Sequence, residues 1–205
     1  MKIVTYPHPA LRFPSRLIMA IDKEVRLKVG EMLELMYTAH GLGLAANQVA
    51  WPFQLFVMNA TAEPERAEHQ RVLINPVVIE RKGFMEGEEG CLSFPELQQK
   101  VRRARSVKVQ AYDLDGKVIE IVTSTLPSPL AELTSRVMQH EIDHLHGILF
   151  IDKMGLLGRR ASRGALKGFE LEFQRAQEKG EYPTVAEIEK QLREMTAEPV
   201  VAERM

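Results

Sequence analysis

The residues best suited to chemistry form the run His140-Glu141-Ile142-Asp143-His144. Residues four apart on a helix lie on the same face, so His140 and His144 can offer two imidazoles to one metal ion. Glu141 directly follows the first imidazole, so its carboxylate can reach a water at the metal without being a ligand. The alternative is a helix that carries two surface histidines. Apolar neighbours favour a buried helix instead, namely Val137, Met138, Ile142 and Leu145.

A catalytic zinc-type site has three protein ligands and leaves one position for water. The third ligand has to come from Cys91, from another carboxylate or from another histidine. Cys91 is the single cysteine of the chain and lies in a glycine-containing turn, Glu89–Ser93. A lone cysteine is most often a small buried apolar residue. Beside a two-histidine helix, we expect its thiolate to complete a Cys-His-His site with one open position.

A glycine-rich segment, Gly41–Gln48, is the next candidate. It lacks both the Gly-x-Gly-x-x-Gly spacing and the Gly-Lys-Ser/Thr ending of nucleotide-binding loops. Glycines at 41 and 43 let the backbone approach a ligand closely, and Gln48 offers an amide donor. The remaining histidines have no supporting pattern and are interpreted as structural or surface residues: His8, His40, His69 and His146.

Two helices are expected to flank these motifs. The first is predicted over Asp22–His40, with Asp22 as N-cap, because apolar residues recur at spacings of three and four; a helix usually stops at a residue such as Gly41. The second would carry the two histidines. It is predicted to start near Pro127, with Ser128 as N-cap and Pro129 in the first turn, and to run through Ala131–His146.

Strands are expected between the two helices. The β-favouring runs are Gln54–Met58, Val72–Ile79, Val107–Tyr112 and Lys117–Thr123. An Asp115-Gly116 turn joins the last two as a hairpin. Strands grouped between helices predict an α+β fold with antiparallel sheet, rather than alternating βαβ units.

The composition limits the class of protein. The 205 residues are 45% hydrophobic and 27% charged, with a net charge of -1. The chain as a whole therefore lacks the net positive charge that is typical of nucleic-acid-binding proteins. No apolar run reaches the roughly 18 residues of a membrane span, and the first residues lack the apolar core of a secretory signal. We expect a soluble cytoplasmic protein with no membrane association.

Three motifs together resemble the peptide deformylase family. They are Gly41–Gln48, Glu89–Ser93 and Gln139–Leu145, intact and in the family's order. A looser resemblance extends from His8 to about Asp152. Any one motif is moderately specific, whereas the ordered triple is very specific.

The resemblance implies an α+β fold with antiparallel β-sheets packed around a central metal-binding helix. It also implies removal of the formyl group from the N-terminal N-formylmethionine of new polypeptides, which releases formate. Cys91, His140 and His144 would hold one metal ion, Fe(II) in the cell, for which nickel, cobalt or zinc can substitute. Glu141 would take a proton from water and pass it to the departing amine.

Further site residues follow from the same resemblance. The Gln48 side chain and the Leu92 backbone N–H would stabilise the oxyanion. The backbone of Gly43 and Glu89 would hold the peptide in extended form. Leu42, Leu133 and Val137 would line a pocket for the methionine. Glu132 and Ser135 depart from the small residues that are usual in the family, and they are expected to border this pocket.

The last part of the chain changes in character. Residues 158–205 are rich in Arg, Lys, Glu and Ala, which predicts one or two surface helices and a frayed end over Glu181–Met205. We therefore expect a deformylase-like catalytic domain over residues 1–157 and a C-terminal helical extension over 158–205. Ribosome docking by the extension is a hypothesis that rests on its basic residues, Arg159, Arg160, Arg163 and Lys167.

Two other functions remain open. One is a different metallohydrolase, such as a peptidase, which Cys91 as third ligand disfavours. The other is a non-catalytic relative that binds peptide or metal only, which intact Glu141 and Gln48 disfavour. A redox role for Cys91 is weaker still, because no second cysteine is present to resolve it.

Overall fold

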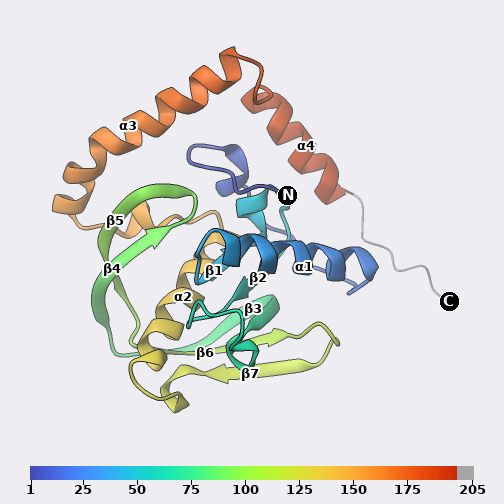
Figure 1. Cartoon of the computed structure of the whole chain (residues 1–205), viewed down its shortest axis with the longest axis vertical. Coiled ribbons are helices and arrows are strands. Elements are labelled where there is room, and N and C mark those ends of the chain that lie inside the picture. Colours follow the sequence, from blue (N-terminus) through green and yellow to red (C-terminus); the bar gives the residue numbers. More distant parts are fainter. Residues whose placement is uncertain (198–205) are drawn as a thin grey trace.

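The structure, a computed structural model, describes residues 1–197. It contains four α-helices and seven strands within these residues, joined by short 3₁₀ turns (Figure 1). The helices are α1 (Lys23–Thr38), α2 (Leu130–Leu145), α3 (Leu156–Glu178) and α4 (Val185–Ala197). The strands are β1 (Gly43–Ala45), β2 (Leu55–Met58), β3 (Arg71–Lys82), β4 (Met85–Cys91), β5 (Phe94–Arg103), β6 (Ser106–Tyr112) and β7 (Val118–Val122).

A five-stranded sheet in the order β1-β2-β3-β6-β7 lies between α1 and α2, and all of its neighbouring strands are antiparallel. Strand β2 shows how it is covered, because successive side chains point to opposite faces. Leu55 and Val57 pack in the cluster of α1, whereas Phe56 and Met58 pack in the cluster of α2. Figure 1 shows the two helices on opposite sides of these strands. The expected α+β class with antiparallel sheet is confirmed.

The first helix forms as its sequence pattern predicts. Val25, Val29, Met32 and Met36 are buried along one face, and the Asp22 side chain accepts the Val25 N–H at 2.9 Å. The helix ends at Thr38, and His40 takes the left-handed conformation with φ 54°. Gly41 closes this end of the helix through its N–H, which donates to Met36 O at 2.8 Å, but the left-handed residue is His40. A Cβ at Gly41 would lie 2.7 Å from Leu92 Cδ1, so this glycine makes room for Leu92.

The expected cap of α2 is wrong. The helix begins at Leu130 after Pro129, and no side chain caps it. A backbone carbonyl takes the place of the cap, since Pro127 O accepts a hydrogen bond from the Ala131 N–H at 3.0 Å. The expected burial of the helix is confirmed, because Val137, Met138, Ile142 and Leu145 are all buried.

A separate two-stranded sheet, β4-β5, was not expected from the sequence. Its hairpin pairs Glu88 with Lys100 and Glu89 with Gln99, and Cys91 is the last residue of β4, opposite Phe94. The β6-β7 hairpin, in contrast, matches the expectation. It pairs Tyr112 with Val118 across a turn that contains Gly116 at φ 75°.

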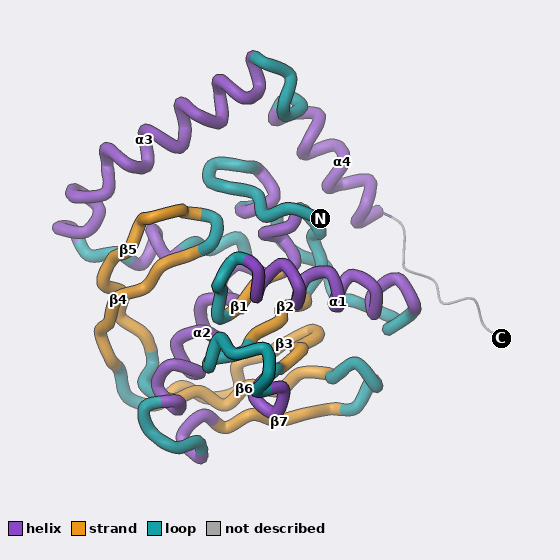
Figure 2. The backbone as a smooth tube through the Cα atoms, in the orientation of Figure 1, coloured by secondary structure: helices purple, strands orange, loops and turns teal. Residues whose placement is uncertain are grey.

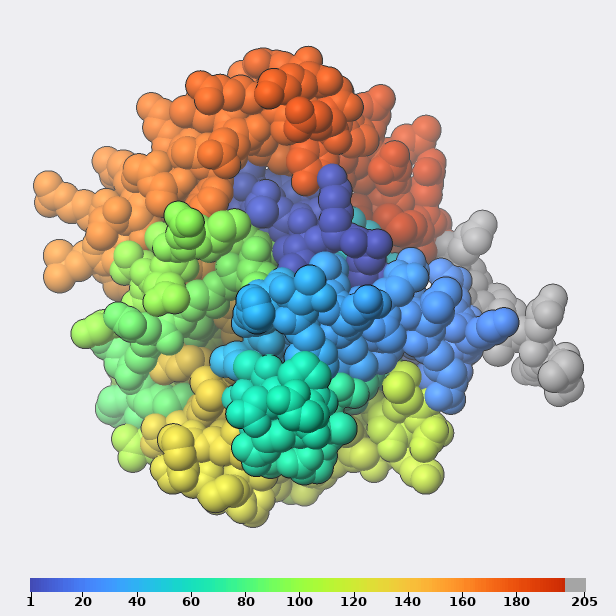
Figure 3. Space-filling model, in the orientation of Figure 1, coloured from blue at the N-terminus to red at the C-terminus, as the bar shows by residue number. Residues whose placement is uncertain are grey.

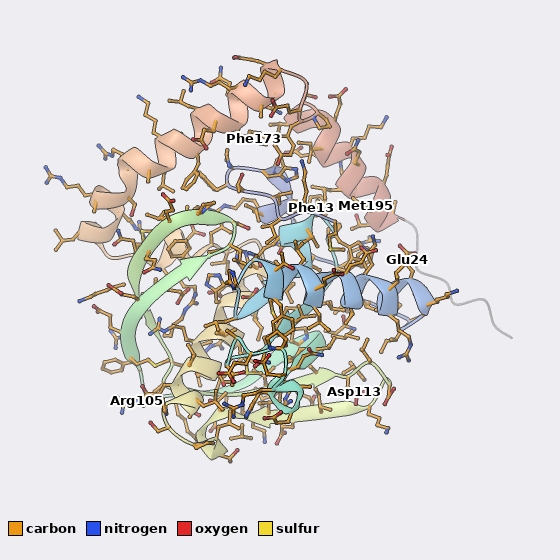
Figure 4. The ribbon with its side chains drawn as sticks, viewed as in Figure 1. Phe13, Glu24, Arg105, Asp113, Phe173 and Met195 are labelled. Carbon is orange, nitrogen blue, oxygen red and sulfur yellow. The ribbon has the colours of Figure 1, made fainter. Side chains whose placement is uncertain are left out.

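The C-terminal helices cover the N-terminal segment. They form an arch above it, and the space-filling view shows the first residues beneath α3 and α4 (Figures 2 and 3). Phe173 projects from α3 into a cluster with Val4 and Leu11, to which α4 adds Ile188 and Leu192 (Figure 4).

The expectation of a frayed end over Glu181–Met205 is therefore wrong for residues 185–197, because side chains four apart give α4 a buried face. Residues 198–205 lie outside the described part. Helix α3 runs through the boundary expected at 157, and that domain division stays a prediction. No helix within residues 1–197 has the length and apolar character to cross a membrane.

Candidate metal and peptide site

Three donor atoms from two elements converge at one point. Helix α2 supplies His140 and His144, whose Nε2 atoms lie 3.2 Å apart, and the end of β4 supplies Cys91, whose Sγ lies 3.2 Å from His144 Nε2. All three donors lie within 4.8 Å of one another. Electron-rich donor atoms that face one another repel, and a cation between them removes this repulsion. The donor set therefore fits a borderline-soft divalent metal, with one position left for a small ligand.

Glu141 lies beside this cluster and is almost fully buried. Among residues 1–197, no group hydrogen-bonds its Oε2 atom, although the residue lines a cavity. Burial raises the pKa of Glu141 to about 7. A carboxyl group with a pKa near neutrality can both accept and return a proton at working pH.

Gly43 controls where the Glu141 carboxylate can lie. A Cβ on Gly43 would lie 2.5 Å from Glu141 Oε1 and 2.8 Å from its Cδ. Glycine is therefore required in β1 by this close approach rather than by an unusual backbone angle. The structure thus shows a close approach of Gly43 to the Glu141 carboxylate, and the expected role of the Gly43 backbone toward a bound peptide stays a prediction.

Gln48 is held rigidly on the other side of the cluster. Its Oε1 accepts the Ala45 N–H at 2.8 Å, and its Nε2 donates to Ser93 Oγ at 3.1 Å and lies 3.5 Å from Cys91 Sγ. The N-terminal segment ties the two loops together, because Gln48 O accepts from Val4 and Ser93 O accepts from Tyr6. The amide is thus fixed beside the Cys91 sulfur.

The Glu89 side chain is buried in a network of charged groups. Its carboxylate accepts from Arg103 Nε at 3.0 Å, from Arg136 Nη1 at 3.1 Å and from His140 Nδ1 at 2.6 Å. Burial alone would raise the pKa of Glu89, but the hydrogen bonds from His140 and Arg103 outweigh it and hold this pKa well below its usual range. Because His140 Nδ1–H donates to Glu89, Nε2 is the ring nitrogen of His140 that can bind a metal ion in the cluster.

Ten of the eleven predicted site residues line one cavity of about 560 Å³. His144 is the exception and lies behind it. The wall consists of the loop before β1, the β4-β5 hairpin and α2. The predicted residues that line it are Leu42, Gly43, Gln48, Glu89, Cys91, Leu92, Leu133, Val137, His140 and Glu141.

The expectation that Glu132 and Ser135 border the cavity is wrong, because neither lines it. Ser135 is turned toward the connection between β5 and β6, where its hydroxyl donates to Ala104 O at 3.1 Å. Glu132 is exposed and lies 3.6 Å from Arg105. Of the other histidines, His8 is buried with its Nδ1 accepting the Ala10 N–H, and His40 lies exposed at the cavity mouth.

Sequence reasoning missed the charged partners of Glu89. Arg103 bridges Glu89 and Asp143, and Lys153 lies 3.2 Å from Asp143 on the far side. The position of Arg136 could have been predicted from the sequence, because it lies four residues before His140 and therefore on the same helix face. Glu89 was expected to act through its backbone, and its side chain proves to be the centre of the network.

Comparison with known proteins gives the family. The sequence profile described as "Polypeptide deformylase" matches residues 1–160. The chain belongs to the peptide deformylase family. It is 38% identical to a peptide deformylase of Rhodopirellula baltica over 197 residues, which cover 96% of this chain and 94% of the relative. It is 43% identical to one from Acidobacterium capsulatum, over 77% of this chain and 88% of the relative.

Solved structures of peptide deformylases are also similar to this chain. A crystal structure of peptide deformylase from Plasmodium falciparum is similar with a TM-score of 0.78 at 35% identity, covering 85% of this chain and 98% of that one. Peptide deformylases are metal-dependent enzymes, and the Cys91, His140 and His144 donors match that requirement. The family profile ends within α3, whereas the Rhodopirellula relative is similar over nearly the whole chain.

Proposed function

We propose that this deformylase removes the formyl group from N-formylmethionyl polypeptides, with Cys91, His140 and His144 as the metal ligands. The observation that carries the proposal is the convergence of these three donors beside Glu141, a buried carboxyl group with one oxygen lacking a partner among the described residues. A divalent metal in this site would act as a Lewis acid toward water and the formyl carbonyl.

The proton chemistry belongs to Glu141. Its pKa near 7 suits a group that takes a proton from the attacking water and returns it to the departing amine. The Gln48 amide and the Leu92 backbone N–H would donate to the developing oxyanion. Gln48 is suited to this role because both ends of its amide are already held in place.

The peptide is proposed to run along the cavity beside β4. The backbones of Gly43 and Glu89 would hold it in extended form, and Leu42, Leu133 and Val137 would contact the methionine side chain. Val137 is buried, whereas Leu133 is partly exposed at the rim. A flexible thioether suits such an irregular apolar wall.

The bound metal is proposed to be Fe(II), one per chain, for which nickel, cobalt or zinc can substitute. Substrates made by ribosomes would place the enzyme in the cytoplasm. Ribosome docking by the C-terminal extension is a hypothesis that rests on Arg159, Arg160, Arg163 and Lys167. Of these, Arg159 already donates hydrogen bonds to Met154 O and Asp152 O. Unchanged ribosome co-sedimentation after truncation at Gly158 would contradict it.

The test is formate release from a formyl-Met peptide by anaerobically prepared, Fe(II)-loaded enzyme. The same peptide without its formyl group is the matched substrate control. We expect formate from the first and no cleavage of the second. Cleavage of the unformylated peptide would favour a peptidase. Metal binding without formate release would favour a relative that only binds peptide or metal.

A further inference from the structure

Helix α2 presents three charged or ligating side chains in a row toward the β4-β5 hairpin. Arg136, His140 and His144 are spaced by four residues and so share one face of the helix. The last two are the proposed metal ligands. Arg136 is 9% exposed, and no part of the proposed chemistry uses it.

The Arg136 guanidinium contacts both strands of the hairpin. Nη1 donates to Glu89 Oε2 of β4 at 3.1 Å and to Val101 O of β5 at 3.0 Å. The β4 backbone also passes close above it, since a Cβ at Gly87 would lie 2.8 Å from Nη2. Arg136 therefore connects α2, which carries two proposed ligands, to the strand that ends in the third, Cys91.

The charges of the network show why Arg103 cannot replace it. Arg103 is shared between two carboxylates, Glu89 and Asp143. Within residues 1–197, Glu89 is the one carboxylate at ion-pair distance from Arg136. Its Oε1 accepts from Arg103 and His140, and its Oε2 accepts from Arg103 and Arg136. Without Arg136, Oε2 keeps only its bond from Arg103, a side chain shared with Asp143, so Glu89 is held less firmly against His140 Nδ1.

We propose that Arg136 is a positioning residue of the metal centre, which locks the β4-β5 hairpin onto α2 and holds Glu89 against His140 Nδ1. The proposal rests on the proposed function in one respect, namely that Cys91, His140 and His144 bind the metal. Groups that orient metal-bound histidines typically change metal affinity or activity by roughly 10- to 100-fold when they are replaced. The same size of effect is expected here, through geometry rather than through contact with substrate.

The experiment titrates the apoprotein with Co(II) under anaerobic conditions, follows the visible absorption of the bound ion, and measures affinity by competition with a chelator. In Arg136→Met, we expect the dissociation constant to rise by about 10- to 100-fold, the absorption bands to shift, and kcat to fall with KM unchanged. Arg136→Lys keeps the charge on a shorter side chain that lacks the planar guanidinium, so its values should lie between those of Arg136→Met and the wild type.

Two further variants serve as a control and as a second way to displace the Arg136 guanidinium. Lys153→Met removes a positive charge from the far side of the same network without touching Glu89, and it should leave the absorption and affinity unchanged. Gly87→Ala pushes a methyl group toward Nη2, and it should reproduce the spectral shift with Arg136 still present. If Arg136→Met does not fold, Arg136→Lys and Gly87→Ala carry the comparison.

Wild-type affinity and spectrum in folded Arg136 variants would overturn the proposal. A rise in KM alone would also overturn it, because that result would assign Arg136 to peptide binding. Failure of the proposed function is separable, since the wild type itself would then bind no Co(II) at one ion per chain or release no formate.

Discussion

Helices α2 and α3 show two ways in which this chain uses a long helix. In α2, 11 of 16 residues are buried, and several of them are polar or charged. In α3, two of 23 residues are buried, Ser162 and Phe173. Helix α2 is restricted from Thr134 to Leu145 by packing and by hydrogen bonds, whereas α3 is held at a few anchor residues. Substitutions in α2 should therefore alter chemistry, and substitutions in α3 should alter stability.

The largest effect is expected for Glu141→Gln. The variant keeps the shape of the side chain but cannot accept a proton from water, so kcat should fall on the order of 10²–10⁴-fold. Metal content should stay at the wild-type level, because Glu141 is not a proposed ligand. Formate release and metal analysis on the same sample check both statements. Wild-type turnover in this variant would remove Glu141 from the mechanism.

A single methyl group at Gly43 tests whether the position of the Glu141 carboxylate determines kcat. Gly43→Ala forces the Glu141 carboxylate out of its position, because the new Cβ would lie 2.5 Å from Oε1. A displacement of this size is expected to lower kcat by about 10²-fold, with the metal retained. The control is Gly30→Ala in α1, where nothing lies within 4 Å, and its kcat should be unchanged. Equal kcat values for the two variants would contradict the account.

Phe173→Ala tests whether a substitution in α3 lowers stability and leaves kcat unchanged. Its ring lies 6.0 Å from that of His8 and 5.4 Å from that of Tyr182. Loss of this anchor should lower the free energy of unfolding by about 3 kcal/mol. The kcat at 25 °C should stay at the wild-type value.

Chemical denaturation and formate release measure these two quantities. Leu171→Ala on the same helix is the control, since that side chain is 43% exposed, and it should cost well under 1 kcal/mol. A large fall in kcat for Phe173→Ala would mean that α3 supports the catalytic site directly.

The smallest expected effect concerns His8. Burial, with a smaller contribution from Lys2, lowers the pKa of His8 to about 4 from its usual 6.5. The folded state therefore binds fewer protons than the unfolded state between these values, and stability falls as the pH drops from 6.5 toward 4. The loss should reach about 2 kcal/mol at pH 5.

His8→Asn keeps an acceptor near the Ala10 N–H and cannot titrate. Its free energy of unfolding should therefore depend less on pH over this range than that of the wild type. Parallel pH dependences in the two proteins would contradict the assignment to His8.

The elements with strong local patterns could be predicted from the sequence. The α1 stripe, the β6-β7 turn and the histidine pair of α2 each depend on neighbours within about five residues, and local rules describe such neighbours well. The β4-β5 hairpin could not be predicted in this way. Strand β4 reads Met-Glu-Gly-Glu-Glu-Gly-Cys, which has neither β-favouring residues nor apolar alternation. Its pairing with β5 places Glu89 where the carboxylate contacts Arg103, Arg136 and His140, and these contacts come from distant parts of the sequence.

The same reasoning separates the predictable part of the site from the rest. Ligand spacing and motif order point to Cys91, His140 and Glu141. The roles of Arg103 and Arg136 depend on distant elements meeting in space, and no local pattern contains that information. Helix α4 is an intermediate case, because Ile188 and Leu192 already lie at helical spacing, but the surface that they cover is known only from the fold.

The central claim is that one metal ion is held by one sulfur and two imidazole nitrogens. X-ray absorption at the metal edge of the zinc-loaded protein measures this directly. We expect one sulfur at about 2.3 Å and two imidazole nitrogens at about 2.0–2.1 Å, with one oxygen or nitrogen ligand completing the set. In Cys91→Ser, the sulfur contribution should vanish. A wild-type spectrum without sulfur would contradict the proposed site.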